Sequence, residues 1–307
     1  MRTAFVRTLT DLAARDDRIV LLTGDLGWSV VEPFAERFPQ RFFNAGVAEQ
    51  NMVGVATGLA EAGFIPFVYS IVTFATLRPY EFIRNGPVLH QLPVRVVGIG
   101  GGFEYGTAGP THHGLEDIAV MRALPGMHVI APADPDQAAT AIRATWDLPG
   151  PVYYRLGKDD HRTVAGLGGR FELGHAQVIR PGRAVLFLAL GSITQEVVVA
   201  AEKLAAQGVD AGVAVVASLS PAPVEDLVHL LDAVPVALTV EAHNVNGGLG
   251  SLVCEVVAEH GLRCRVRRLG ARDAADGHSG SESHLWERHG ISADALTAAA
   301  TRALDAE

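Results

Sequence analysis

The 307-residue sequence has few cysteines, no basic block and no long apolar run. Its two cysteines, Cys254 and Cys264, cannot form a disulfide framework, so we expect reduced thiols in a cytoplasmic protein. The net charge of −9 argues against a nucleic-acid partner. No apolar segment approaches the roughly 20 residues that span a bilayer. Charged residues at positions 11–17 interrupt any signal-peptide core, so we expect neither a leader nor a membrane anchor.

The sequence does have the composition and the alternation of an α/β protein. Hydrophobic residues make up 49% and charged residues 19% of the chain, as in a globular protein. Its length suffices for two domains with separate cores. Short apolar segments alternate with segments of helical periodicity, which predicts parallel sheets covered by helices on both faces. We therefore expect two doubly wound α/β domains.

The expected elements form two sets with a glycine-rich segment between them. The first set has helices at 3–15, 74–91, 115–123 and 135–146, and strands at 19–23, 65–69, 94–99, 127–131 and 151–155. The second set has strands at 184–190, 211–217, 235–240 and 264–269, helices at 193–207, 223–232 and 247–260, and a last helix after a polar loop at 271–284. Residues 158–182 lack apolar periodicity. We predict a first domain at 1–165, a linker at 166–182 and a second domain at 183–307.

Residues 43–63 resemble the end of a strand, a turn and a helix. Asn44 is the expected cap near the turn, and Gly63 is the expected stop. Gly54, Gly58 and Ala62 lie four residues apart and give the helix one nearly bare face. Because each helical glycine costs roughly 1 kcal/mol relative to alanine, we expect the same helix of a second copy to pack closely against this face.

Glu49 lies in the first turn of this helix, among small and apolar residues. A glutamate is seldom buried without a partner, so burial at this position would indicate a functional carboxylate. A solvent-exposed glutamate favoured by the helix dipole fits the residues equally well. From the residues alone, both interpretations stay open.

One segment resembles the catalytic-glutamate motif of the transketolase family of thiamine-diphosphate enzymes: Gly46-Val47-Ala48-Glu49-Gln50-Asn51-Met52. The resemblance extends, in order and spacing, over most of the chain. The other matching segments are 23–26, 73–76, 78–81, 109–117 and 129–134. The resemblance favours a buried, functional Glu49 over a solvent-exposed one.

The resemblance implies a site for the aminopyrimidine half of thiamine diphosphate. Glu49 matches the catalytic glutamate, which holds the pyrimidine N1′ and so helps the cofactor lose its C2 proton. Phe74 matches the aromatic residue that stacks on the pyrimidine ring. Asp25 and Leu26 match a cofactor-side segment, and Ile71 stands where the family has a second phenylalanine.

For the substrate, the resemblance implies four contact residues. His112 matches a channel residue that contacts hydroxyls or a phosphate. Arg2 and Ser29 match phosphate-side positions, and Lys158 stands where the family has a phosphate-binding arginine.

Two further positions depart from the family. Gly100 replaces a substrate-binding histidine, and Ala108 replaces an acidic residue before the Gly-Pro pair. A site that has lost these hydrogen-bonding groups should reject the usual sugar phosphate by a few kcal/mol. We therefore expect an intact cofactor site with altered substrate recognition.

The chain lacks the Gly-Asp-Gly and downstream asparagine with which the family binds the diphosphate and Mg²⁺. Gly24-Asp25-Leu26 is not that motif, so we expect no metal ligand in this chain. The glycine-rich turn at 247–250, with Glu241-Ala242-His243-Asn244 before it, matches a packing feature of the family's C-terminal domain. A separate subunit is expected to supply the diphosphate-binding domain.

These features predict the smaller subunit of a split transketolase-like enzyme, with thiamine diphosphate and Mg²⁺ bound mainly by a diphosphate-binding partner in an α2β2 assembly. The expected reaction transfers a two-carbon ketol or acyl unit to an aldehyde or ketone. Three alternatives stay open: a protein similar to 1-deoxyxylulose-5-phosphate synthase, a 2-oxoacid dehydrogenase beta subunit, and a catalytically idle partner subunit.

Overall fold

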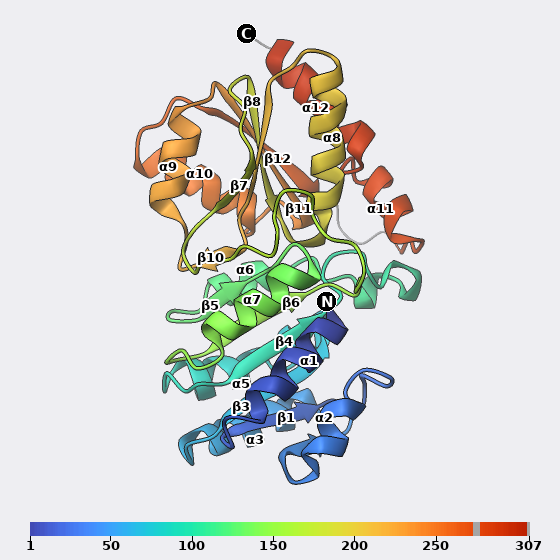
Figure 1. The fold of residues 1–307 in the computed structure, drawn as a ribbon, viewed down its shortest axis with the longest axis vertical. Helices are drawn as coiled ribbons and strands as arrows, with labels where there is room; N and C mark the ends of the chain where they lie inside the picture. The colour runs from blue at the N-terminus through green and yellow to red at the C-terminus, as the bar shows by residue number, and fades with distance from the viewer. Residues whose placement is uncertain (273–276, 306–307) are drawn as a thin grey trace.

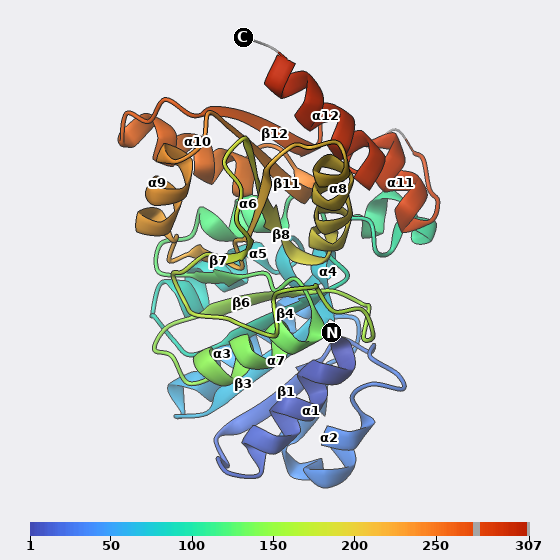
Figure 2. The same cartoon turned by 45° about the horizontal axis from the view of Figure 1, so that its top comes forward.

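The computed structural model describes residues 1–272 and 277–305 and contains two α/β domains stacked along the long axis of the molecule (Figure 1). The first domain holds the N-terminus, which lies close to the second domain. The second domain carries the C-terminus at its far end, and both views show this arrangement (Figures 1 and 2). The predicted fold class is confirmed.

The first sheet has the strand order β10-β5-β6-β4-β3-β1-β2, and all neighbouring strands except β10 and β5 are parallel. Its strands are β1 (Ile19–Thr23), β2 (Phe42–Asn44), β3 (Ile65–Ile71), β4 (Arg95–Ile99), β5 (His128–Ile130), β6 (Val152–Leu156) and β10 (Ser218–Ser220). Its helices are α1 (Arg2–Ala13), α2 (Glu32–Arg37), α3 (Glu49–Glu61), α4 (Val72–Thr76), α5 (Tyr80–Ile83), α6 (Asp117–Arg122) and α7 (Pro135–Thr145).

The second sheet has the order β12-β11-β8-β9-β7, parallel except for the pair of β7 and β9. Its strands are β7 (Gln177–Arg180), β8 (Val185–Leu190), β9 (Ala211–Val215), β11 (Val236–Asn244) and β12 (Arg265–Ala271). Its helices are α8 (Thr194–Ala206), α9 (Val224–Asp232), α10 (Leu249–Glu259), α11 (Glu282–Arg288) and α12 (Ala293–Asp305). Helices α9 and α10 cover one face, while α8 and α12 cover the other (Figure 1).

Strand periodicity divides the core between the two faces of each sheet. In β8, Leu186 and Leu188 join one apolar cluster, whereas Val185 and Phe187 join another. This division follows from the alternation of side chains along a strand. The cluster that contains Leu186 also includes Met52 of α3, so one continuous apolar core runs from the first domain into the second.

Arg155 of β6 links the two domains. Its side chain is buried and forms a 2.9 Å ion pair with Asp117 of α6. The same guanidinium donates to the backbone oxygens of Gly114 and of Ala242 in β11, each at 2.9 Å. Hydrogen bonds from a charged donor are stronger than neutral ones, so this residue fixes the position of the second domain against the site described below.

The structure differs from the expected elements in several places. The helix expected at 74–91 is instead α4, α5 and a π-helical turn at Arg84–Val88, because Pro79 and Pro87 interrupt the α-helical hydrogen bonds. Asn44 does not cap α3: its Oδ1 accepts from the backbone of Asp25 and Gly46, and Ala48 is the N-cap. Gly63 does follow the end of α3, with φ +92°.

Four further elements were not expected. Strand β7 lies within the segment 158–182, where we expected no regular structure. Strand β10, from the second half of the chain, joins the first sheet. Helix α2 follows β1, and α11 precedes the last helix, α12. The loop expected at 271–284 lies partly outside the described residues. No helix in the described part of the chain has both the length and the apolar character to cross a membrane.

Candidate active site at the carboxyl edge of the first sheet

The predicted cofactor residues gather where β1, β2 and β3 end. In an open parallel sheet, ligands bind in the crevice outside the carboxyl ends of the strands. Gly24 follows β1, Glu49 is the first residue of α3 after β2, and Phe74 lies in α4 directly after β3. The topology therefore brings together residues that are up to 50 positions apart in the sequence.

The carboxylate of Glu49 is buried, with 1% of the residue exposed. The Ser70 hydroxyl donates to Oε1 at 2.9 Å, and Nη1 of Arg78 lies 2.5 Å from Oε2. A Cβ on Gly24 would lie 3.1 Å from Oε1, so the glycine lets the β1 loop pass close to the acid. The interpretation of Glu49 as a solvent-exposed first-turn residue is wrong.

Arg78 is a site residue to which the sequence analysis gave no role. Its guanidinium carbon lies 4.3 Å from the centroid of the Phe74 ring, a cation–π arrangement, while its Nη1 contacts Glu49. The side chain of Arg78 is 37% exposed. Arg78 thus connects the two residues expected to hold the pyrimidine ring. Arg78 belongs to the segment 78–81, which resembles the family, and this resemblance was the sequence signal that could have identified it as a site residue.

Phe74 and His112 form the next part of the site. The ring of His112 meets the half-buried ring of Phe74 edge to face, with centroids 5.1 Å apart. His112 ends a short 3-10 turn that begins after Gly109, whose φ of +85° is readily adopted only by glycine. The predicted substrate residue therefore lies beside the predicted cofactor residue.

The remaining cofactor-side residues lie around this centre. Asp25 has φ +60°, and its Oδ1 accepts from Nδ2 of Asn44 at 2.9 Å. The backbone oxygen of Leu26 accepts from the Thr23 hydroxyl at 2.8 Å. Ile71 is half-buried at the last position of β3. The loop after β1 is thus held by its own hydrogen bonds.

The glycine at position 100 has a structural reason. A Cβ on Gly100 would lie 2.1 Å from the ring of Tyr105, and the residue has φ +79°. Tyr105 therefore occupies the space that any side chain at position 100 would need. The ring of Tyr105 is 6.3 Å from that of His112 and 4.1 Å from Nζ of Lys158, so it separates these two predicted substrate residues.

Arg2 and Lys158 lie together, and Ser29 does not join them. Both cations line a cavity of about 260 Å³ between the domains, here called the interdomain cavity. Its polar lining also includes Glu104, Ser192 and Glu282. Ser29 lines a separate cavity of about 320 Å³ beside α1 and α2. The four predicted substrate residues therefore lie in three places. Arg2 and Lys158 line the interdomain cavity, His112 contacts the ring of Phe74, and Ser29 lies beside α1.

The described residues offer no group of three or more His, Cys, Asp or Glu side chains that could hold a metal ion. The glycine-rich turn before α10 is occupied by the chain's own carboxylate. Glu241 accepts from the backbone nitrogens of Leu249 and Gly250, each at 2.8 Å. Because these donors are satisfied internally, this helix start holds no free anion site.

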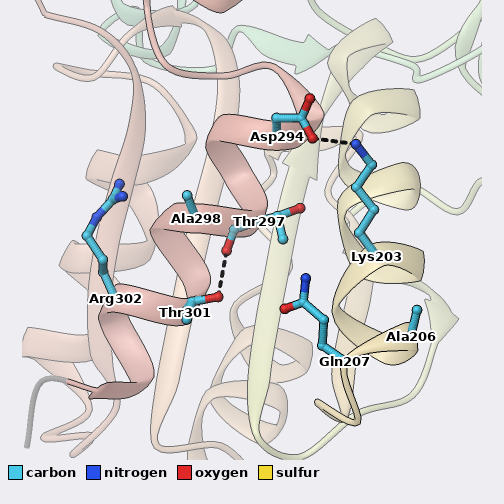
Figure 3. Close-up of a pocket in the computed structure, with 8 residues that line it drawn as sticks. All are labelled: Lys203, Ala206, Gln207, Asp294, Thr297, Ala298, Thr301 and Arg302. Atoms are coloured by element: carbon cyan, nitrogen blue, oxygen red, sulfur yellow. Dashed lines mark hydrogen bonds and ion pairs between the residues drawn. The ribbon is translucent and has the colours of Figure 1, made fainter.

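A further hollow, of about 650 Å³, lies between α8 and α12 of the second domain (Figure 3). Lys203 and Asp294 form an ion pair across it, and Thr301 and Arg302 lie along its α12 side. None of the predicted site residues lines this groove. It is therefore not part of the candidate active site.

Comparisons with known proteins match the chain to two family models, one for each domain. The family model of the transketolase pyrimidine binding domain matches residues 1–163, and that of the transketolase C-terminal domain matches residues 174–296. A solved structure described as "Split gene transketolase, inactive beta4 tetramer" superposes with a TM-score of 0.89 and 37% sequence identity. That match covers 99% of this chain and 97% of the other.

Three curated relatives have nearly the same length as this chain. A putative transketolase C-terminal section from Methanocaldococcus jannaschii is 37% identical, over 96% of this chain and 93% of the relative. The 6-deoxy-6-sulfo-D-fructose transketolase subunit SqwH from Clostridium sp. is 37% identical, over 98% of this chain and 93% of the relative. An apulose-4-phosphate transketolase subunit from Actinobacillus succinogenes is 33% identical, over 91% and 90%. The chain belongs to the transketolase family of thiamine-diphosphate-dependent enzymes.

Proposed function

We propose that this chain is the smaller subunit of a split, thiamine-diphosphate-dependent transketolase-like enzyme. The observation that carries the proposal is the buried carboxylate of Glu49 beside Phe74, at the carboxyl edge of a parallel sheet. The reaction transfers a two-carbon ketol or acyl unit to an aldehyde or ketone acceptor. Relatives that cover the chain nearly end to end are named as transketolase subunits, which supports this reaction class.

The residues present fit the pyrimidine half of the cofactor. Glu49 offers a buried carboxyl group that can hold a proton at N1′, and Phe74 offers a half-buried aromatic ring. Gly24 leaves the space next to Glu49 free of a side chain. When bound, thiamine diphosphate supplies the nucleophilic C2 carbon, while the protein orients the reacting groups and excludes water.

A separate subunit supplies the diphosphate and Mg²⁺ sites in this proposal. One observation supports a partner: several relatives named as transketolase subunits or sections, and the solved split-gene transketolase, have the same extent as this chain. The simplest assembly is α2β2. The solved relative, described as an inactive tetramer of beta chains, supports self-association of this type of chain.

The bare face of α3 is the proposed site of self-association. Gly58 has no atom within 4 Å of an added Cβ, and Gly54 has only one contact, at 3.9 Å from Phe82. Val55 and Phe82, next to these glycines, are 45% and 42% exposed. A small-residue stripe flanked by exposed apolar side chains suits close packing of a second helix.

A second interpretation, a protein similar to 1-deoxyxylulose-5-phosphate synthase, is supported by sequence similarity to that enzyme. The 1-deoxy-D-xylulose-5-phosphate synthase of Syntrophotalea carbinolica is 35% identical over 96% of this chain, which spans 46% of that relative. That enzyme class uses the same cofactor, so the test below applies to both interpretations. A catalytically idle subunit is the third outcome.

The test is the substitution Glu49→Gln in the complex reconstituted with its diphosphate-binding subunit. Exchange of the cofactor C2 proton, followed by NMR after acid quench, should slow by about two to four orders of magnitude, the range for lost acid–base assistance. Cofactor binding should persist, because the partner holds the diphosphate. Glu61→Gln, at the exposed end of the same helix, is the matched control. Unchanged exchange in Glu49→Gln would favour the idle subunit.

A further inference from the structure

Arg78 lies in the turn between α4 and α5 and contacts both residues proposed to hold the pyrimidine ring. Its guanidinium carbon is 4.3 Å from the centroid of the Phe74 ring, and its Nη1 is 2.5 Å from Oε2 of Glu49. The other oxygen of that carboxylate, Oε1, accepts from the Ser70 hydroxyl. Both oxygens of Glu49 and the ring of Phe74 therefore have partners within the free chain.

These contacts resemble those that an aminopyrimidine ring would make. A pyrimidine protonated at N1′ is a flat, delocalised cation that donates from its edge, and a guanidinium shares these properties. Either group can stack on an aromatic ring while an N–H in its plane reaches a carboxylate. The guanidinium of Arg78 thus makes the pair of contacts, one to Phe74 and one to Glu49, that the pyrimidine requires.

Two other arginines show how this chain attaches a guanidinium permanently. Arg95 is fully buried and donates to three backbone oxygens at positions 146–150. Arg155 is also buried and donates to one carboxylate and two backbone oxygens. The side chain of Arg78, in contrast, is 37% exposed, and among the described residues it donates to Glu49 alone. Its release costs little, because water can hydrogen-bond the freed guanidinium.

We propose that Arg78 takes the place of the aminopyrimidine ring in the free chain, and that binding of the cofactor displaces it from Glu49 and Phe74. This inference rests on the proposed function and adds an internal competitor to the proposed cofactor site. Because the pyrimidine must replace an ion pair, its apparent affinity is reduced to the extent that Arg78 holds the site. The competitor keeps the half-site filled until the cofactor arrives.

The first experiment follows the Arg78 side chain in the full chain. NMR of the side-chain nitrogens of labelled arginine reports whether the guanidinium is paired or free, and Arg78→Lys assigns the signal. The probe is the free hydroxymethyl aminopyrimidine, which is the pyrimidine half of thiamine without its thiazolium ring. At saturation with this probe, we expect the Arg78 signal to move into the narrow range of exposed arginines. A saturated chain whose Arg78 signal keeps its position would overturn the proposal.

The second experiment measures the affinity of the same probe by NMR titration. Arg78→Ala removes the competitor but leaves Glu49 and Phe74, so the probe should bind about tenfold more tightly than to the wild type. Arg84→Ala, at an exposed position whose side chain bonds to Asn85, is the matched control and should leave the affinity unchanged. Arg78→Lys keeps the charge but loses the planar group, so its affinity should fall between those of the wild type and Arg78→Ala.

Weaker or equal binding by Arg78→Ala would overturn the proposal, because Arg78 would then be a neighbour of the bound pyrimidine and not its competitor. Failure of the probe to bind any variant would overturn it as well, whereas binding to Arg78→Ala alone would support it. The wild-type NMR signal decides the question if Arg78→Ala does not fold. Failure of the proposed function is a separate result, since it appears as unchanged C2 proton exchange in Glu49→Gln whatever the pyrimidine affinities are.

Discussion

The two sheets each place a buried glutamate next to the start of a helix, and they satisfy it differently. Glu241 in the second domain is 0% exposed and accepts from two backbone nitrogens of α10. Glu49 in the first domain is 1% exposed and contacts two side chains, Ser70 and Arg78. Burial alone therefore does not distinguish a structural acid from one that we propose to act on a cofactor.

The partners make the distinction. Backbone donors at a helix start cannot leave without unfolding the helix, so Glu241 is fixed as a cap. Arg78 is 37% exposed, and a long side chain of that exposure can move aside when a ligand takes its place. A buried carboxylate with an exchangeable partner is what a cofactor-binding acid requires. Substitutions at Glu241, Arg78 and Glu282 test this contrast between buried acids, and a substitution at Gly58 compares a glycine of α3 with one of α10.

Glu241→Gln should lower the free energy of unfolding by roughly 3 kcal/mol, because hydrogen bonds to a charged acceptor contribute about 1.5–3 kcal/mol each and one oxygen becomes a donor. Urea unfolding of the isolated chain measures this loss. Exchange of the cofactor C2 proton in the complex should stay at the wild-type rate. Slowed exchange in a stably folded Glu241→Gln variant would show that Glu241 is more than a helix cap.

Arg78→Met should lower the free energy of unfolding by about 2 kcal/mol. Removing one partner of a buried pair costs about 3–5 kcal/mol, and water reaching the half-exposed site reduces that loss. Arg84→Met is the control, since Arg84 is exposed and its side chain bonds to Asn85. In the Glu49→Gln background, Arg78→Met should lower the free energy of unfolding by less than it does in the wild type, because the carboxylate that pairs with Arg78 is absent. Additive losses would show that the two residues do not interact.

Gly58→Leu should weaken self-association by roughly 1–3 kcal/mol through overpacking. A Cβ added at Gly58 meets no atom of the described chain within 4 Å, whereas a Cβ added at Gly250 in α10 would lie 2.8 Å from the Arg268 side chain. The isolated subunit should therefore fold as well as the wild type or gain up to about 1 kcal/mol from helix propensity. Analytical ultracentrifugation at low concentration measures assembly, and Ala298→Leu, at an exposed position of α12, is the control. An unchanged mass would place the interface elsewhere.

Glu282 is a third acid to compare, and its Oε1 is buried without a hydrogen-bond partner among the described residues. Burial, with a smaller effect of Glu104, raises its pKa from 4.5 to about 8. Its folded-state pKa exceeds its unfolded one, so its contribution to stability is complete below pH 4.5 and disappears as pH rises through 8. The wild type should therefore lose stability relative to Glu282→Gln between pH 5 and pH 8 in paired urea titrations. A constant difference would contradict the raised pKa.

The periodicity of the sequence predicted most elements of both domains, because buried parallel strands and amphipathic helices carry their pattern locally. It missed the break at Pro79, where a longer helical pattern hid the interruption. It also missed β7 and β10, two short antiparallel edge strands. Such strands depend on the neighbour with which they pair rather than on their own residues.

Some residues of the candidate site could likewise be predicted from the sequence, and others could not. Glu49, Phe74 and His112 could be named from the sequence through their resemblance to a family, and the structure brings them to one edge of the sheet. Arg78 as the partner of Glu49 could not be predicted, because an ion pair between residues 29 positions apart depends on how α3 packs against the segment between α4 and α5. The role of Tyr105 beside Gly100 required the loop geometry.

The sequence by itself determined the α/β class and the two-domain order, because local periodicity is a property of the chain. Its resemblance to a family supplied the residues proposed for the pyrimidine half-site. Only the tertiary structure decided which buried acid is a cap and which has an exchangeable partner. It also decided that Arg2, Glu104, Lys158 and Glu282 share one cavity. The charge that a substrate meets depends on which side chains neutralise one another, and that is set by distances in space.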